Sequence, residues 1–107
     1  MVTNGVVTLY GYDASVCEYV HNGSYTAWIY HQMRTKTTPD GVVAREVYDV
    51  RIPHKVRGGI KSGDLVCFEK SDAQKPDFGK CSRIAAVTEN RVGSVRHWHI
   101  EAENQYR

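Results

Sequence analysis

An alternation of apolar and polar side chains with a period of two, over residues 79–102, restricts the fold of this chain more than any other feature. Successive side chains of a β-strand point to opposite faces, so the alternation predicts two strands of a half-buried sheet. In the second strand one face carries Trp98, Ile100 and Ala102, and the other carries Val95, His97, His99 and Glu101. In the first strand one face carries Ile84, Ala86 and Thr88, and the other carries Ala85 and Val87. The turn-forming residues between the strands, including Gly93, predict a hairpin whose Trp98 anchors the core.

A longer hairpin is predicted over Tyr25–Ile52, with its turn at Pro39-Asp40-Gly41. In the outgoing strand one face carries Ala27, Ile29, His31 and Met33, and the other carries Trp28, Tyr30, Gln32 and Arg34. In the returning strand one face carries Tyr48, Val50 and Ile52, and the other carries Val47, Asp49 and Arg51. The tip, TKTTPDG, is polar, so the end of this hairpin is expected to project beyond the core.

The other segments are shorter. Val6–Tyr10 and Leu65–Glu69 are predicted strands, because both are rich in β-branched and aromatic or other apolar residues. The tetrapeptide His21-Asn22-Gly23-Ser24 predicts a tight turn, since Asn-Gly readily takes positive φ angles. Lys55–Ser62 and Ser71–Lys80 are predicted loops.

Helical periodicity is nearly absent from the chain. Short strands separated by regular turn signals predict an all-β domain: a small β-barrel or sandwich of five to seven mostly antiparallel strands with a long projecting hairpin. Residues 1–107 form a single domain in this interpretation, and residues 1–5 and 103–107 are expected to be loose ends.

Composition narrows the cellular context only modestly. The formal net charge of +2 neither demands nor excludes a nucleic-acid partner. No apolar run is long enough to span a bilayer, and the first residues do not resemble a secretory signal, so we expect a cytoplasmic protein without a membrane partner. Three cysteines, Cys17, Cys67 and Cys81, then predict reduced thiols, with Cys67 acting as a small buried hydrophobic residue.

Motifs for catalysis or for a cofactor are not found in the sequence. His97 and His99 share a strand face at a spacing that suits a transition metal, given a third ligand from His31, Cys81 or Glu101, but the plain reading is two polar surface residues. The sequence has no G-x-S-x-G elbow and no phosphate-binding glycine loop. We therefore expect neither an enzyme nor a bound cofactor or metal.

Two binding functions remain open. Aromatic residues interleaved with lysine and arginine on a small barrel are typical of an OB-like single-stranded nucleic-acid-binding domain, where bases stack on the rings. Alternatively, the hairpin Tyr25–Ile52 and the loops Lys55–Ser62 and Ser71–Lys80 contact other proteins. The candidate interface residues are Trp28, Tyr30, Arg34, Lys36, Thr37, Asp40, Lys55 and Arg57.

The succession VTLY, AWIY, YDVRIP, SGDLV and RIAAVTENRVGSVRHWHIE resembles a family of small proteins encoded in bacteriophage and prophage structural-gene clusters, mainly of Gram-positive hosts. The resemblance covers about residues 6–102 and is most specific in Val87–Trp98 and Val50–Pro53. The layout is also similar to head–tail connector proteins of the stopper or head-completion type, which are small β-barrels with an extended arm that assemble as rings at the portal vertex.

The resemblance implies a virion structural or assembly protein, present in the host cytoplasm during assembly and then in the virion. Its implied partners are other phage structural proteins, namely portal, adaptor or tail proteins, and it would form a ring of identical copies in the particle. A protein on the tail side of the junction would share much of this layout.

Overall fold

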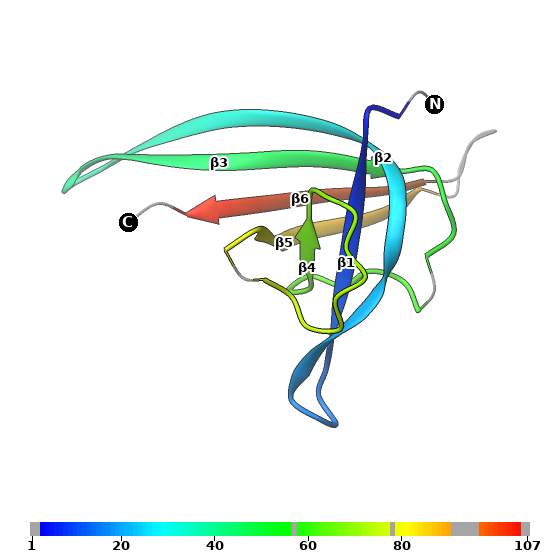
Figure 1. Ribbon diagram of the computed structural model, residues 1–107. Coiled ribbons are helices and arrows are strands. Elements are labelled where there is room, and N and C mark those ends of the chain that lie inside the picture. Colours follow the sequence, from blue (N-terminus) through cyan, green and yellow to red (C-terminus); the bar gives the residue numbers. More distant parts are fainter. Residues whose placement is uncertain (1–2, 57, 78, 91–96, 106–107) are drawn as a thin grey trace.

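The computed structural model describes residues 3–56, 58–77, 79–90 and 97–105; for residues 34, 36, 43–45, 90 and 104–105 it describes the backbone alone. Six strands occur in the described residues: β1 (Gly5–Asp13), β2 (Glu18–Thr38), β3 (Gly41–Ile52), β4 (Leu65–Cys67), β5 (Cys81–Asn90) and β6 (His97–Gln105). They form a closed antiparallel barrel in the order β1-β2-β3-β6-β5-β4 (Figure 1). The all-β barrel with a long projecting hairpin is therefore confirmed. β6 continues to Gln105, so it includes residues expected as a loose end.

The core of the barrel comes from side chains that alternate along each strand. Its centre is fully buried and consists of Val7, Ala27, Val50, Ile52, Val66, Ile84, Ile100 and Ala102. The predicted apolar faces of β3 and β6 are confirmed, because Val50 lies opposite Ile100 and Ile52 lies opposite Trp98 in the register. Burial of these β-branched side chains supplies the main driving force for closing the barrel.

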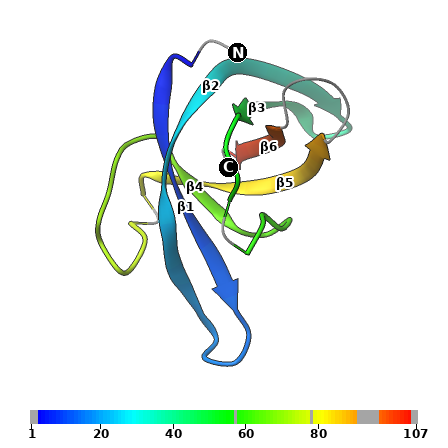
Figure 2. The ribbon, with the colours of Figure 1, turned by 90° about the vertical axis from the view of Figure 1, so that its right-hand side faces the viewer.

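Strand β1 is buried on both faces. Val7 and Leu9 point into the barrel, and the side chains of Thr8 and Tyr10 are covered from outside by the loop after β4. The Thr8 hydroxyl donates to the Glu69 carbonyl at 2.6 Å, and the Tyr10 hydroxyl donates to the Ala73 carbonyl at 3.0 Å. This loop packs on the side of the barrel in Figure 2, so the first part of Ser71–Lys80, predicted to meet neighbouring molecules, is held by its own domain.

Strand β2 is the longest element and belongs to two hairpins. Its first half pairs with β1 as far as Ala27, and its second half pairs with β3 from Trp28 onward. The predicted turn at His21–Ser24 is wrong, because β2 runs straight through these residues. The register with β1 shifts at Leu9/Tyr10, which leaves Asn22 as an extra residue, so the Asn-Gly pair marks a β-bulge. The hairpin turns at residues 14–17 instead, where Cys17 has a φ of +53°.

A second bulge changes the predicted faces of β5. The register with β6 shifts between Ile84 and Ala86, so Ala85 is the extra residue. Ile84 and Val87 consequently both pack toward the core, whereas Ala86 and Thr88 are exposed. The prediction that Ile84, Ala86 and Thr88 share one face is therefore wrong. The hairpin of β5 and β6 is confirmed as an antiparallel pair, while its predicted turn around Gly93 lies outside the described residues.

Candidate interaction surface

The end of the β2–β3 hairpin extends past the other strands as a two-stranded ribbon. β6 accompanies β3 only as far as Arg45, and β1 accompanies β2 only as far as Ala27. Figure 1 shows the tip of this hairpin lying beyond the end of β6. We call residues 31–46 the arm; its base is still paired with β6, and beyond Arg34 and Arg45 only β2 and β3 are paired among the described residues. The tip closes between Thr38 and Gly41, whose φ of +131° is readily adopted only by glycine, which confirms the predicted turn.

The base of the arm is fixed to the barrel by stacked rings on its inner face. The His31 and Tyr48 rings stack with centroids 4.6 Å apart, and Tyr48 stacks in turn on Phe68 at 4.3 Å. His31 also lies 3.4 Å from a carboxylate oxygen of Glu46. Burial, and then the negative charge of Glu46, raise the pKa of Tyr48 above its ordinary value. These contacts give the arm a defined direction where it leaves the barrel.

Beyond this stack the arm exposes apolar surface. Met33 is 56% exposed and Val42 is 68% exposed. Neither side chain contributes to the core, and an exposed methionine is adaptable in the contacts it can make. The arm therefore offers apolar groups to a partner.

The outer face of the sheet carries the aromatic residues predicted for the interface. Trp28 and Tyr30 stack in parallel with centroids 5.7 Å apart. The guanidinium carbon of Arg51 lies 5.4 Å from the centroid of the Trp28 ring. Tyr30 is half exposed, whereas Trp28 is partly buried between its neighbours. This ladder of three side chains presents one flat, semi-apolar surface beside the arm.

Acidic residues of β3 and β6 lie next to that ladder on the same outer face. Asp49 accepts a hydrogen bond from the Gln32 amide at 3.1 Å and lies 3.3 Å from the His99 ring nitrogen Nε2. Glu101 lies opposite Asp49 in the register of β3 and β6. The outer face therefore places the carboxylates of Asp49 and Glu101 close to the Arg51 guanidinium, and carboxylates are unfavourable neighbours for a phosphate backbone.

The hairpin of β1 and β2 forms a second projection, which the sequence analysis did not single out. Figure 1 shows it leaving the barrel in a different direction from the arm. Among the described residues, the large exposed hydrophobic side chains all lie in these two hairpins: Tyr12, Val16 and Val20 in one, and Tyr30, Met33 and Val42 in the other. The sequence has apolar residues on both sides of the observed turn at residues 14–17. The turn wrongly predicted at Asn22-Gly23 assigned these residues to other elements.

The other predicted interface residues lie in different parts of the molecule, and not all of their side chains are described. Thr37 and Asp40 are exposed on the arm, and Lys55 is exposed in the loop after β3, away from the arm. Arg34 and Lys36 lie in β2, but their side chains are not described. Arg57 lies outside the described residues. The loop residue therefore does not belong to the same surface as the arm.

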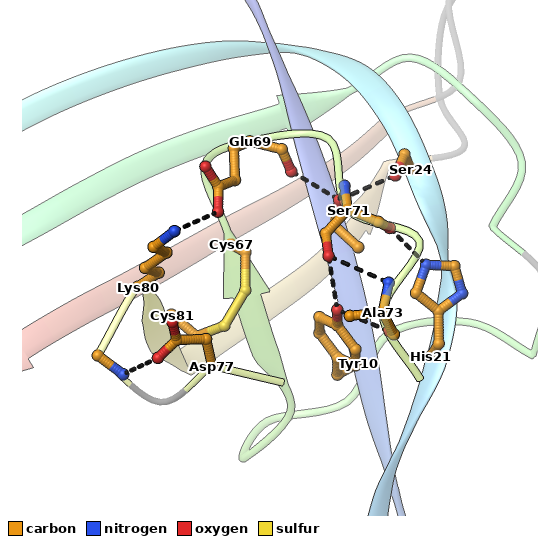
Figure 3. The surroundings of a disulfide bond; sticks show 12 residues. Tyr10, His21, Ser24, Cys67, Glu69, Ser71, Ala73, Asp77, Lys80 and Cys81 are labelled. Carbon is orange, nitrogen blue, oxygen red and sulfur yellow. Dashed lines mark hydrogen bonds and ion pairs between the residues drawn. A yellow bond between two sulfur atoms is a disulfide. The ribbon is translucent and has the colours of Figure 1, made fainter. Parts of the chain in front are cut away.

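The thiols differ from the prediction of three reduced cysteines. Cys67 and Cys81 lie opposite each other in β4 and β5 and form a disulfide (Figure 3), while Cys17 is free and exposed. Cys67 is buried, as predicted. The disulfide fixes the base of the loop that covers β1, where Figure 3 also shows the hydrogen bonds of Tyr10 and His21 to that loop.

The histidines are spread over separate surroundings. His31 lies on the inner face of the arm, His99 lies beside Asp49 on the outer face, and Cys81, a possible third ligand, is in the disulfide. Within the described residues no group of three histidine, cysteine or acidic side chains is placed to hold a metal ion.

Trp98 lies at one end of the barrel rather than at its centre. It is partly buried against the core and lines a hollow of about 630 Å³ together with residues of β5, β6 and the loop after β3, among them His54, Glu89 and His97. Trp98 therefore contributes to the core from one end of the barrel, whereas the fully buried centre consists of smaller aliphatic side chains.

Comparison with family models, with curated proteins and with solved structures finds no match for the chain. No helix in the described residues has the length and apolarity needed to cross a membrane.

Proposed function

We propose that this chain is a non-enzymatic structural or assembly protein of a bacteriophage or prophage virion, acting through protein–protein contacts at the head–tail connector. Its partners in this proposal are portal, adaptor or tail proteins and further copies of itself in a ring. The phage context comes from the resemblance of the sequence segments. The mode of action comes from the geometry.

The observation that carries the proposal is the arm. A two-stranded ribbon outside a barrel buries little of its own surface, and isolated hairpins are marginally stable in water. The arm nevertheless exposes Val42 on this ribbon and Met33 just before it, while its base is fixed by the His31–Tyr48–Phe68 stack. An anchored projection with apolar groups is well suited to contact a neighbouring subunit.

Shortening the arm tests the proposal. Replacing Thr37–Val42 with a two-residue Asn-Gly turn, which joins the paired residues Lys36 and Val43, keeps the register of β2 and β3 and every residue of the barrel core. The isolated domain should therefore keep its melting temperature within a few degrees. In the proposed context, particle assembly should be abolished, measured as infectious titre and as head–tail joining by electron microscopy. Normal infectivity of this variant would exclude the arm as an essential interface.

A single-stranded nucleic-acid-binding domain is the second candidate, supported by the Trp28–Tyr30–Arg51 ladder on a barrel face. The neighbouring acidic residues Asp49 and Glu101 argue against it. Oligonucleotide binding that is tight at low salt and collapses as salt rises would favour this candidate. Absence of binding at low salt would remove it.

A further inference from the structure

Strand β2 has an open edge along the arm. β1 covers that edge only to Ala27, and no strand among the described residues pairs with it beyond this point. The side chain of Asn4 closes the next position, because its amide donates to the Ile29 carbonyl at 2.9 Å and its carbonyl oxygen accepts the Ile29 N–H at 2.7 Å. A side-chain amide here takes the place of one peptide unit of a neighbouring strand.

The two bonds to Ile29 fix the direction of the backbone groups that follow. The register of β2 and β3 is regular from Trp28↔Arg51 to Thr38↔Gly41, without a bulge. Because backbone groups alternate along a strand, His31, Met33, Thr35 and Thr37 point their N–H and C=O groups to the same edge as Ile29. Four consecutive outward residues present donors and acceptors that would order an added strand.

The charge of this edge selects the kind of strand that fits. From Ile29 to Thr38, β2 contains Arg34 and Lys36 and no acidic residue. Opposite charges in cross-strand pairs stabilise a sheet, whereas like charges destabilise it. Pairing two copies through this edge would bring four basic residues into one short interface. An acidic segment avoids this repulsion.

We propose that the edge of β2 from His31 to Thr37 binds an extended, acidic segment of a partner protein as an added β-strand. The backbone supplies the hydrogen bonds, and acidic residues at alternate positions of the segment complement Arg34 and Lys36. Asn4 sets the limit of the site, since it already occupies the edge at Ile29. The inference rests on the proposed function in one respect, namely that the arm is the contact surface.

Amide hydrogen exchange of the full chain tests strand addition directly. The probe is a capped peptide of alternating threonine and glutamate with the length of His31–Thr37, and a peptide of alternating threonine and lysine is its control. With the glutamate peptide we expect exchange at the amides of His31, Met33, Thr35 and Thr37 to slow by about tenfold or more. Absence of this protection at saturating peptide would overturn the proposal, as would equal binding of the lysine peptide.

Two substitutions at one position separate backbone pairing from side-chain contact. Met33→Pro removes an N–H that points to the open edge and leaves the β2–β3 hydrogen bonds intact, so peptide affinity should fall about fivefold. Met33→Ala keeps the N–H and should bind within about twofold of wild type. Equal affinities of the two variants would contradict strand addition.

The double variant Arg34→Glu and Lys36→Glu should prefer the lysine peptide.

The same variants distinguish this inference from the proposed function. If shortening the arm abolishes particle assembly and Met33→Pro assembles normally, the arm is an interface but not through an added strand. If both assemble normally while the peptide protects the four amides, strand addition stands and the proposed role in the virion falls.

Discussion

Single extra residues in two strands decide which side chains reach the core. Ala85 in β5 and Asn22 in β2 each shift the register by one. After Ala85, the inward positions change from even to odd numbers, so Val87 joins Ile84 in packing on the core. The phenolic hydroxyl of Tyr25 donates to the Asn22 side chain at 2.8 Å, which stabilises the other irregular position. A strict alternation of period two assigns the wrong face to every residue beyond such a bulge.

The bulge at Ala85 predicts opposite outcomes for two adjacent lysine substitutions. Val87→Lys should destabilise the domain by about 2 kcal/mol or more, because it brings a charge to the edge of the core. Ala86→Lys should change stability by less than about 0.5 kcal/mol, since Ala86 is exposed. Urea unfolding of both variants is the measurement. If Ala86→Lys proves the more damaging of the two, the strand alternates without a bulge.

The Tyr48 hydroxyl makes stability depend on alkaline pH. Burial and the Glu46 charge raise its pKa above the ordinary value of 10.0, so the folded state retains this proton where the unfolded state loses it. The contribution of Tyr48 to stability is therefore complete below pH 10 and declines as pH rises toward the folded-state pKa. We expect the melting temperature of wild type to fall more steeply above pH 10 than that of Tyr48→Phe. Parallel curves for the two proteins would contradict this linkage.

At the scale of elements, local sequence patterns predicted most of the strands but only some of the turns that connect them. The arm was predictable because Pro39-Asp40-Gly41 interrupts two alternating runs, and the turn and pairing follow from neighbouring residues. The first hairpin was not, since Asn22-Gly23 is the strongest local turn signal in its segment and tertiary pairing with β1 overrides it. Of the candidate interface, Tyr30 and the tip were predictable, whereas Tyr12, Val16 and the open edge required the pairing partners of β2.

The disulfide between β4 and β5 could not be predicted from local sequence patterns. Cys67 and Cys81 are 14 residues apart, and only the antiparallel register places them opposite each other. Closing a loop of this size removes entropy from the unfolded chain equivalent to about 3 kcal/mol. The double variant Cys67→Ala and Cys81→Ala should therefore unfold at lower temperature, and reductant should lower the wild-type melting temperature.

The free cysteine supplies the control for that prediction. Cys17→Ser should melt like wild type and respond to reductant like wild type, because Cys17 is exposed and outside the disulfide. Alkylation of the denatured, unreduced chain should label one thiol. Labelling of three thiols would contradict the disulfide.

At the scale of the whole molecule, the barrel is closed by its shortest strand. β4 contributes three residues between β1 and β5, and the remaining closure depends on Asp64 immediately before it. The buried Asp64 carboxylate accepts the N–H groups of Tyr12 at 3.1 Å and Lys61 at 3.0 Å. Its own backbone carbonyl accepts the Ile84 N–H at 2.8 Å. The sequence alone does not indicate this role, because Tyr12 and Ile84 are distant from Asp64 in the chain.

Removing this carboxylate should weaken the closure of the barrel more than its size suggests. Asp64→Ala leaves the N–H groups of Tyr12 and Lys61 without their acceptor, and a hydrogen bond to a charged group contributes about 1.5–3 kcal/mol. We expect the free energy of unfolding to fall by about 2–4 kcal/mol, with faster amide exchange at Tyr12, Lys61 and β4 than in β3 and β6. Asp72→Ala, at an exposed position in the following loop, is the control and should remain within about 0.5 kcal/mol of wild type. Equal stability of the two variants would mean that β4 alone closes the barrel and that the carboxylate only shapes the turn.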